Sequence, residues 1–186
     1  MSLLAIYPET GGEALQRFSE PSDIQHALNS HQVQFERWDA DFPLADNAEP
    51  DTILAAYQTS IDRLKTIHGF QSVDVINMYP EHPDKQPLRE KFFAEHCHAD
   101  FEVRFFIQGQ GLFYLHLNEQ VFAVLCTQGD LISVPKNTPH WFDMGAEPNF
   151  KCIRLFTTPE GWVADFTGSD IAQRFPDLDQ FSQRHT

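Results

Sequence analysis

The chain has 186 residues with 13 Lys and Arg against 27 Asp and Glu, so its formal net charge is −14. A surface this acidic repels phosphate backbones and anionic membranes, which argues against nucleic acid and membrane surfaces as partners. No stretch approaches the roughly 20 apolar residues that a membrane span needs, and MSLLAIYPET lacks the basic flank of a signal peptide. We therefore expect a cytoplasmic protein that is a monomer and forms a single domain over residues 1–186.

The cysteines argue against a covalent or zinc-bound framework. Cys97, Cys126 and Cys152 are odd in number and show no CxxC spacing. We expect all of them to be reduced thiols.

The first half of the chain predicts mixed helix and strand. SEPSDIQHALNSH (19–31) and EPDTILAAYQTSIDRLKTIHG (49–69) each place a proline near the start of an apolar stripe at helical spacing. In the second segment Gly69 stands where a C-terminal cap belongs, which favours one long helix. VDVINMY (73–79) alternates like a strand, and PLREKFFAEH (87–96) is typical of a short helix.

From residue 101 onward the apolar period changes to two, and turn signals recur at short intervals. The predicted strands are FEVRFFI (101–107), LFYLHL (112–117), VFAVLC (121–126), LISVP (131–135), HWFDM (140–144) and FKCIRLF (150–156). Such a series indicates a mainly β antiparallel sandwich or small barrel. The tail predicts a turn, a strand-like piece and a short helix beginning at Ser169 or Asp170. We expect a helical and strand N-terminal part over about 1–94 and a barrel core over about 72–167.

The stretch EHCHADFEVRFFIQGQG (95–111) concentrates polar side chains in a run otherwise typical of a strand. On a strand, His96 and His98 share a face about 6.6 Å apart, so both imidazoles can reach one ion. Glu102 would lie about 13 Å beyond His98 if the strand continued, whereas metal–ligand bonds are only ~2 Å long. A metal site here therefore requires the chain to turn at residues 99–101.

His140, at the start of a later strand, is the candidate fourth ligand, because strands distant in sequence lie side by side in a barrel. Three imidazoles and one carboxylate suit Fe(II), Ni(II), Co(II) or Mn(II) in six-coordinate geometry better than a closed structural zinc site. Four protein ligands leave two positions open for chemistry. The alternative reading of each histidine taken alone is an ordinary hydrogen-bonded residue.

The segments HCHADFEVRFFIQG and GDLISVPKNTPHWF resemble the two signature motifs of the cupin superfamily. Within it, the sequence is similar to the bacterial acireductone dioxygenases of methionine salvage. This resemblance runs through FERWDAD, AAYQTSIDRL, LREKFFAEHCH, EVRFFIQGQGLFYLH, DLISVPKNTPHWFDMG, EPNFKCIRLF and PEGWVADFTG. It implies a cupin-type jelly-roll barrel whose metal ligands are His96, His98, Glu102 and His140.

The resemblance also implies a reaction. The substrate would be the acireductone 1,2-dihydroxy-3-keto-5-methylthiopentene, cleaved with O2 to formate and 4-methylthio-2-oxobutanoate by an Fe(II) form, or to carbon monoxide, formate and 3-methylthiopropanoate by a Ni(II) form. Arg104 matches a residue that helps to generate the substrate dianion, and Glu95 matches a position linked to metal incorporation. Phe101 stands where an acidic residue would be expected.

Arg104 shares strand parity with Glu102, so its guanidinium can reach the same cavity and stabilise a dianion, with Arg154 as a second candidate. Either arginine could instead pair with one of the many acids. For the apolar methylthioethyl tail we expect contacts from Phe92, Phe142 and Trp162, although aromatic residues in barrel strands often belong to the core. The rival interpretations are another cupin metalloenzyme, such as an isomerase or a different small-molecule dioxygenase, and a non-catalytic cupin that binds a metabolite.

Overall fold

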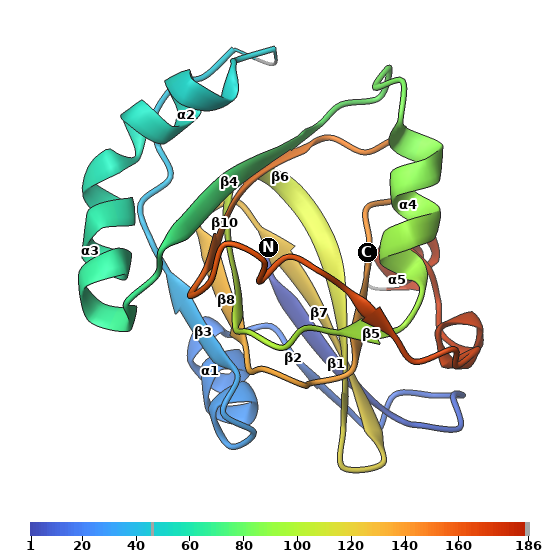
Figure 1. Ribbon diagram of the computed structural model, residues 1–186. Helices are drawn as coiled ribbons and strands as arrows, with labels where there is room; N and C mark the ends of the chain where they lie inside the picture. The colour runs from blue at the N-terminus through green and yellow to red at the C-terminus, as the bar shows by residue number, and fades with distance from the viewer. Residues whose placement is uncertain (46, 185–186) are drawn as a thin grey trace.

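The computed structural model describes residues 1–45 and 47–184 and has the mainly β architecture that we expected (Figure 1). Its strands are β1 (Leu3–Pro8), β2 (Gln16–Phe18), β3 (Gln34–Arg37), β4 (Ser72–Met78), β5 (His96–Cys97), β6 (Glu102–Leu117), β7 (Gln120–Thr127), β8 (Asp130–Val134), β9 (His140–Asp143), β10 (Phe150–Phe156) and β11 (Asp165–Phe166). The helices are α1 (Pro21–Asn29), α2 (Pro50–Ala56), α3 (Gln58–His68), α4 (Lys85–Phe93) and α5 (Leu178–Arg184), with a 3-10 turn, η1 (Ile171–Arg174).

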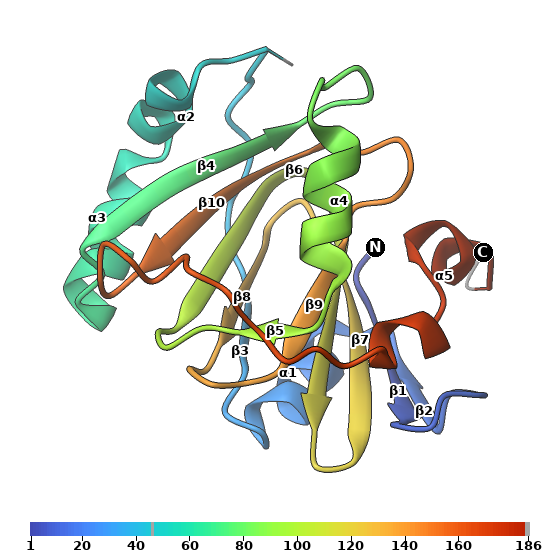
Figure 2. The ribbon, with the colours of Figure 1, turned by 45° about the vertical axis from the view of Figure 1, so that its right-hand side comes forward.

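All strand pairs are antiparallel, and the long strand β6 belongs to both walls of a barrel. On one wall the order is β11-β5-β9-β6-β7-β1-β2, and on the other β4 pairs with β10, β10 and β8 pair with β6, and β3 pairs with β8. Apolar side chains from both walls fill the space between them, among them Phe106, Phe113 and Phe142. Strands β5 and β9, which begin with His96 and His140, pair with each other and lie on the wall opposite β4 and β10 (Figure 2).

The N-terminal strands take part in this sheet rather than forming a separate layer. β1 pairs with β7 along its whole length, and β3 pairs with β8. The strands of the barrel thus begin at Leu3, well before the range of about 72–167 expected for the barrel core. This pairing supports our proposal that residues 1–186 form one domain.

One predicted turn is replaced by a bend within a strand. Two strands were expected on either side of Gly109, but β6 runs continuously from Glu102 to Leu117. Gly109 has φ 71°, and the register between β6 and β10 shifts beside it, between Lys151 and Cys152. A glycine at positive φ lets the strand bend from one wall into the other without leaving the sheet.

Helices α2 and α3 cover the outside of the barrel, whereas apolar residues of α1 and α4 pack against the core between its walls. The long helix expected over 49–69 is instead two helices, because Tyr57 leaves helical geometry with φ −105° and ψ 15°. Both pack beside the β4 wall, and Gly69 ends α3 in the left-handed conformation as expected. The segment η1 and the unexpected helix α5 pack against the other wall.

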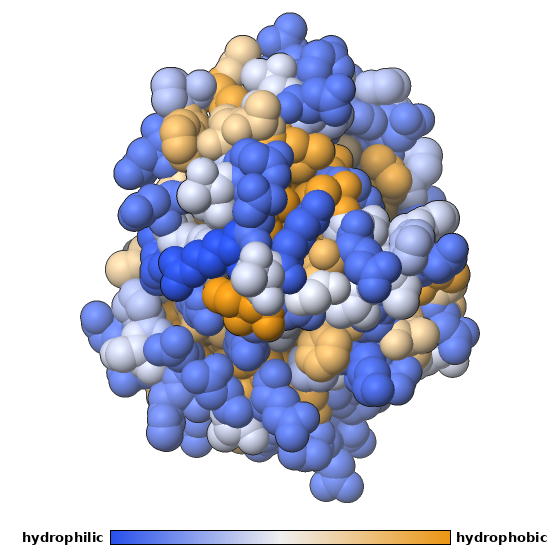
Figure 3. All heavy atoms as spheres, turned by 60° about the vertical axis from the view of Figure 1, so that its left-hand side comes forward, coloured by the Kyte–Doolittle hydropathy of each residue, from blue (hydrophilic) through white to orange (hydrophobic). Residues whose placement is uncertain are grey.

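Hydrophilic side chains cover most of the face drawn in Figure 3, and apolar side chains gather near its middle.

Within the described residues, no helix has both the length and the apolar character that a membrane crossing demands. Cys97, Cys126 and Cys152 are all free thiols, as expected.

Candidate metal centre

The chain bends sharply between the first two candidate ligands and the third. β5 ends at Cys97 and β6 begins at Glu102, as the spacing required. The buried carboxylate of Asp100 fixes this bend, because it accepts hydrogen bonds from the backbone amides of Phe101 (2.7 Å), Thr157 (2.6 Å) and Thr158 (2.9 Å). The loop after β10 therefore holds the turn that brings Glu102 back toward the histidines.

Three imidazoles meet at this place from β5, the bend and β9. His96, His98 and His140 are all buried, and their nearest ligand nitrogens lie within 4.8 Å of one another. Their ring centroids are 4.5 to 5.3 Å apart. His96 and His140 are paired directly across β5 and β9, so the sheet register itself brings these two residues together.

Each imidazole is oriented by a backbone carbonyl. The Nδ1 atoms of His96, His98 and His140 lie 2.7 Å, 2.8 Å and 2.7 Å from the carbonyl oxygens of Ala94, Val163 and Thr138. A carbonyl oxygen only accepts, so each Nδ1 donates a proton to it, and Nε2 is left as the nitrogen that can bind a metal. Metal-binding histidines are typically oriented in this way.

Glu102 adjoins two of the three imidazoles. Its Oε2 lies 3.1 Å from Nε2 of His140 and 3.5 Å from Nε2 of His98. Both partners thus face the carboxylate with the nitrogen that would bind a metal. Glu102 therefore adjoins the group of three histidines from β6, and its part as the fourth ligand stays a prediction.

The surroundings shift the pKa values of three of these donors, and the shifts of His96 and Glu102 favour the protonation state that a metal requires. Burial, reinforced by the neighbouring His140, lowers the pKa of His96 to about 4. Burial raises the pKa of Glu102, but Arg104 and the two histidines outweigh it and hold this pKa well below its usual value. For His98, burial lowers the pKa, whereas the hydrogen bond and charge of Glu102 raise it, and the net direction is upward.

The residues therefore fit a divalent metal ion. Burying three imidazoles and an ionised carboxylate beside one another is costly, and a shared cation would offset that cost. The donors are nitrogen and oxygen only, which agrees with the borderline metals expected from the sequence.

Arg104 lies beside the carboxylate, as its position along β6 predicted. Its Nε donates to Oε1 of Glu102 at 2.8 Å, and its guanidinium carbon lies 4.6 Å and 4.8 Å from the ring centroids of Phe142 and Phe113. The side chain is 2% exposed, and within the described residues its Nη1 has no hydrogen-bond partner. Arg104 therefore holds a buried N–H donor that is available to a ligand.

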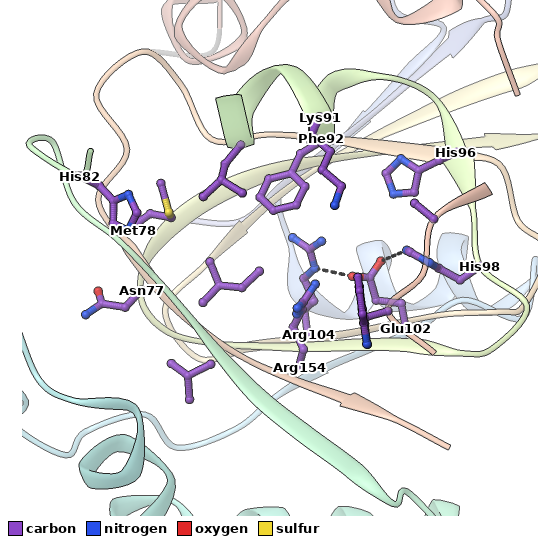
Figure 4. A pocket seen from close by; sticks show the side chains of 15 residues that line it. Asn77, Met78, His82, Lys91, Phe92, His96, His98, Glu102, Arg104 and Arg154 are labelled. Carbon is purple, nitrogen blue, oxygen red and sulfur yellow. Dashed lines mark hydrogen bonds and ion pairs between the residues drawn. The ribbon is translucent and has the colours of Figure 1, made fainter. Parts of the chain in front are cut away.

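A cavity of about 300 Å³ opens beside these groups (Figure 4). His96, His98, Glu102 and Arg104 line one part of it. The remaining wall comes from β4, the loop after it, α4, β10 and the loop after β10, and consists of Val75, Ile76, Asn77, Met78, His82, Leu88, Lys91, Phe92, Arg154, Trp162 and Ala164. A ligand in this cavity would have its polar end at the imidazoles, with Val75, Ile76, Met78, Leu88 and Phe92 as apolar contacts and Lys91 and Arg154 as charged ones.

Not all of the other side chains predicted to contact a substrate line the cavity. Phe92 and Trp162 line the cavity, and Trp162 is half exposed at 50%. Phe142 is completely buried and is not among the lining residues, because it lies in the core beneath the guanidinium of Arg104. Arg154 lines the cavity but also forms a bidentate ion pair with Asp74 at 2.8 Å and 2.7 Å.

Glu95 precedes the metal cluster but does not line the cavity. It is buried, with Oε1 3.0 Å from Nδ1 of His116 and Oε2 accepting a hydrogen bond from the Thr167 hydroxyl at 2.6 Å. The second nitrogen of His116 lies 3.1 Å from Glu9. Glu95 therefore ties β6 and the C-terminal segment to the strand that carries His96, and its predicted link to metal incorporation stays a prediction.

Apart from Phe92, the sequence did not identify the residues of β4 and α4 that line the cavity, among them Met78, Leu88 and Lys91. The alternating pattern of β4 identified a strand but not which barrel edge it would occupy. Only the pairing of β4 with β10 brings this wall opposite the histidines.

An antiparallel barrel with three converging imidazoles and an adjoining carboxylate defines a metal-binding protein of the cupin type. The family model described as ARD/ARD' family matches residues 4–164. The chain belongs to that family.

Similar proteins agree over almost the whole length. The chain is 58% identical to the acireductone dioxygenase of Aquifex aeolicus over 97% of this chain and 98% of that protein. It is 57% identical to that of Methylococcus capsulatus, with 100% of both chains covered. Among solved structures, the acireductone dioxygenase of Bacillus anthracis with a cadmium ion in its active centre matches with a TM-score of 0.79 and 29% identity, covering 89% of this chain and 98% of that one.

Proposed function

We propose that this protein is a metal-dependent dioxygenase that cleaves an acireductone, 1,2-dihydroxy-3-keto-5-methylthiopentene, with O2 in methionine salvage. The observation that carries the proposal is the buried group of His96, His98 and His140 with Glu102 beside it, at one end of a cavity with apolar walls. Membership of the ARD/ARD' family supports the same activity.

His96, His98, His140 and Glu102 would hold one Fe(II) or Ni(II) ion, and Co(II) or Mn(II) would suit the same donors. A bound divalent ion supplies Lewis acidity, which lowers the pKa of an enediol and favours its electron-rich dianion. The backbone carbonyls of Ala94, Thr138 and Val163 keep the three imidazoles in the tautomer that this role needs. We propose that the metal decides the products, namely formate and 4-methylthio-2-oxobutanoate with iron, or carbon monoxide, formate and 3-methylthiopropanoate with nickel.

Arg104 would act on the charged end of the substrate. Its Nε is already bound to Glu102, but the buried Nη1 is directed at no described acceptor and can donate to an enediolate oxygen. Since an unpaired buried donor is costly, a substrate oxygen placed there gains a strong charge-assisted hydrogen bond. Arg154 would contribute more weakly, because Asp74 already occupies its guanidinium.

The methylthioethyl tail would lie against the apolar part of the cavity. Phe92 and Trp162 remain our aromatic candidates, now joined by Met78 and Leu88. Phe142 would instead support Arg104 from below, at 4.6 Å from its guanidinium carbon. The cavity thus has one end for the reacting enediol and another for the thioether.

A different cupin metalloenzyme, such as an isomerase, would use the same four donors, and a metabolite-binding cupin would need no reaction at all. We favour the dioxygenase because Nη1 of the buried Arg104, which has no partner within residues 1–45 and 47–184, suits an anionic enediolate oxygen. The charge of −14 supports our further proposal that the protein is a monomer.

The test is an anaerobic mixture of acireductone with protein loaded with either iron or nickel, to which oxygen is then added. We expect the absorbance of the enediolate to decay with stoichiometric oxygen uptake, and carbon monoxide to appear only with nickel. Turnover that proceeds without oxygen would support an isomerase, and absence of oxygen uptake with both metals would contradict the proposal.

A further inference from the structure

Three cationic side chains line the cavity, namely Arg104, Arg154 and Lys91, and they differ in how their charge is balanced. Arg104 is paired with Glu102 at 2.8 Å, and Arg154 is paired with Asp74 at 2.7 Å. Each arginine thus has its own carboxylate. These two pairs contribute no net charge to the cavity.

Lys91 has no such carboxylate. Within the described part of the chain, no ion pair or side-chain hydrogen bond joins Lys91 to an acid, whereas Lys85 on the same helix is paired with Glu147 at 3.0 Å. In Figure 4 the ammonium group of Lys91 points into the cavity beside Phe92, on the side where Arg104 and His96 lie. Lys91 therefore brings one uncompensated positive charge to the rim of the site.

The helix that carries Lys91 is fixed relative to the metal ligands. Arg89, one half-turn earlier on α4, binds the buried Asp143 through Nε at 2.7 Å and Nη2 at 3.0 Å. Asp143 lies at the end of β9, the strand that begins with His140. Since α4 is tied to that strand, the backbone of Lys91 keeps a constant position beside the imidazoles, while its side chain can follow a ligand.

We infer that Lys91 is a substrate-binding residue that contacts the anionic enediolate oxygens at the mouth of the cavity. This inference rests on the proposed function, because it takes an anionic acireductone as the ligand. The protein as a whole carries −14, so its long-range field repels such an anion. A mobile ammonium group at the rim offsets that repulsion where the ligand enters, and a lysine suits this role since its compact charge stays hydrated on a flexible stem.

The experiment compares metal-loaded wild type with Lys91→Met, Lys91→Arg and Lys65→Met. Lys65 lies on α3, outside the cavity, so its variant changes the net charge equally and serves as the matched control. We expect Lys91→Met to lower kcat/KM about tenfold, the loss typical of one charge-assisted hydrogen bond at a partly exposed site. The loss should lie mainly in KM, and anaerobic titration of the enediolate should show the same weakening of binding.

The other variants and the salt dependence separate binding from structure. Because Lys91→Arg keeps the charge, its kcat/KM should stay within about threefold of wild type. The ratio of wild type to Lys91→Met should fall toward one as ionic strength rises, since salt screens an exposed charge. Metal content and thermal midpoint should be the same in all four proteins.

Several results would overturn the inference. Lys91→Met binding and turning over the acireductone as well as Lys65→Met would show that Lys91 does not contact the substrate. Loss of metal or of thermal stability in Lys91→Met would assign it a structural role instead. If wild type binds the acireductone anaerobically but does not consume oxygen, the proposed function fails, and the binding titration alone still decides the role of Lys91. A wild type that does not bind acireductone removes both.

Discussion

His96 and His140 face each other across neighbouring antiparallel strands, with ring centroids 4.5 Å apart, although one precedes and the other follows the long strand β6. Among the described residues, these two form the single register pair of the β5–β9 ladder. The metal centre is therefore built into the sheet register. A change in either strand would act on the site and on the pairing together.

Removing either imidazole should empty the site. We expect His96→Ala and His140→Ala to bind a divalent metal more than about 100-fold more weakly, because changes outside the direct ligands already cost 10- to 100-fold. Metal analysis after gel filtration would measure this. His26→Ala, on the exposed side of α1, is the control and should keep full occupancy. Full metal in His96→Ala or His140→Ala would show that the ligand assignment is wrong.

Arg104→Lys should separate chemistry from metal binding. The lysine keeps the positive charge beside Glu102 but loses the fork that donates from both Nε and Nη1. We expect kcat to fall about 100-fold or more, the usual cost of removing one preorganised donor to a developing charge. Metal content should be unchanged. Steady-state kinetics with near-normal kcat would contradict a role for Arg104 at the substrate.

The bend before Glu102 should depend on Asp100. Asp100→Ala leaves the amides of Phe101, Thr157 and Thr158 without their acceptor, and each such loss typically costs about 1–3 kcal/mol. We expect lower stability and about 10- to 100-fold weaker metal binding, since the ligands themselves remain. Asp100→Asn keeps one acceptor oxygen and should be affected less. Equal metal affinity in wild type and Asp100→Ala would refute this role for the bend.

The pKa of His96 predicts how the metal-free protein responds to acid. Its folded pKa is about 4 against an ordinary value of 6.5, so between these pH values the unfolded chain binds more protons than the folded one. Stability should therefore fall as pH drops from 6.5 to 4, by about 3 kcal/mol from this residue.

Urea unfolding of chelator-treated protein across that pH range would measure the effect. His96→Gln should lose this share of the dependence, whereas the raised pKa of His98 acts in the opposite direction in both proteins. Identical pH profiles for wild type and His96→Gln would mean that His96 is not held neutral by its surroundings.

The bend of β6 at Gly109 allows a test of how closely β6 approaches the start of β10. A Cβ at Gly109 would lie 1.9 Å from the carbonyl oxygen of Asn149, and the residue has φ 71°. Gly168 has a similar φ of 74° but nothing within 4 Å of the added atom, so Gly168→Ala is a matched control. The control should cost roughly 1–2 kcal/mol from backbone strain, and Gly109→Ala clearly more. Equal losses in chemical denaturation would argue against the close approach of β6 to β10.

Much of the site could be predicted from the sequence because the residues concerned are close together in the chain. The spacing of His96, His98 and Glu102 required a bend between strands, and the structure has that bend at residues 98–101. Parity along one strand placed Arg104 beside Glu102. These relations depend only on strand geometry, which the residue pattern fixes.

Other features depended on contacts that no local pattern contains. The break at Tyr57 interrupts a segment whose apolar stripe favours one continuous helix. The continuous strand β6 arises because Gly109 allows a bend where a turn was expected. The complete burial of Phe142 and the position of Lys91 at the rim follow from how α4 packs against β9.

The most direct measurement is a crystal structure of the protein loaded with a single divalent metal, with the ion located by anomalous scattering. We expect one ion per chain, bonded at about 2 Å to Nε2 of His96, His98 and His140 and to the carboxylate of Glu102, with positions left open toward the cavity. An ion bound through Nδ1 atoms, fully enclosed by protein ligands, or located away from these four side chains would contradict it.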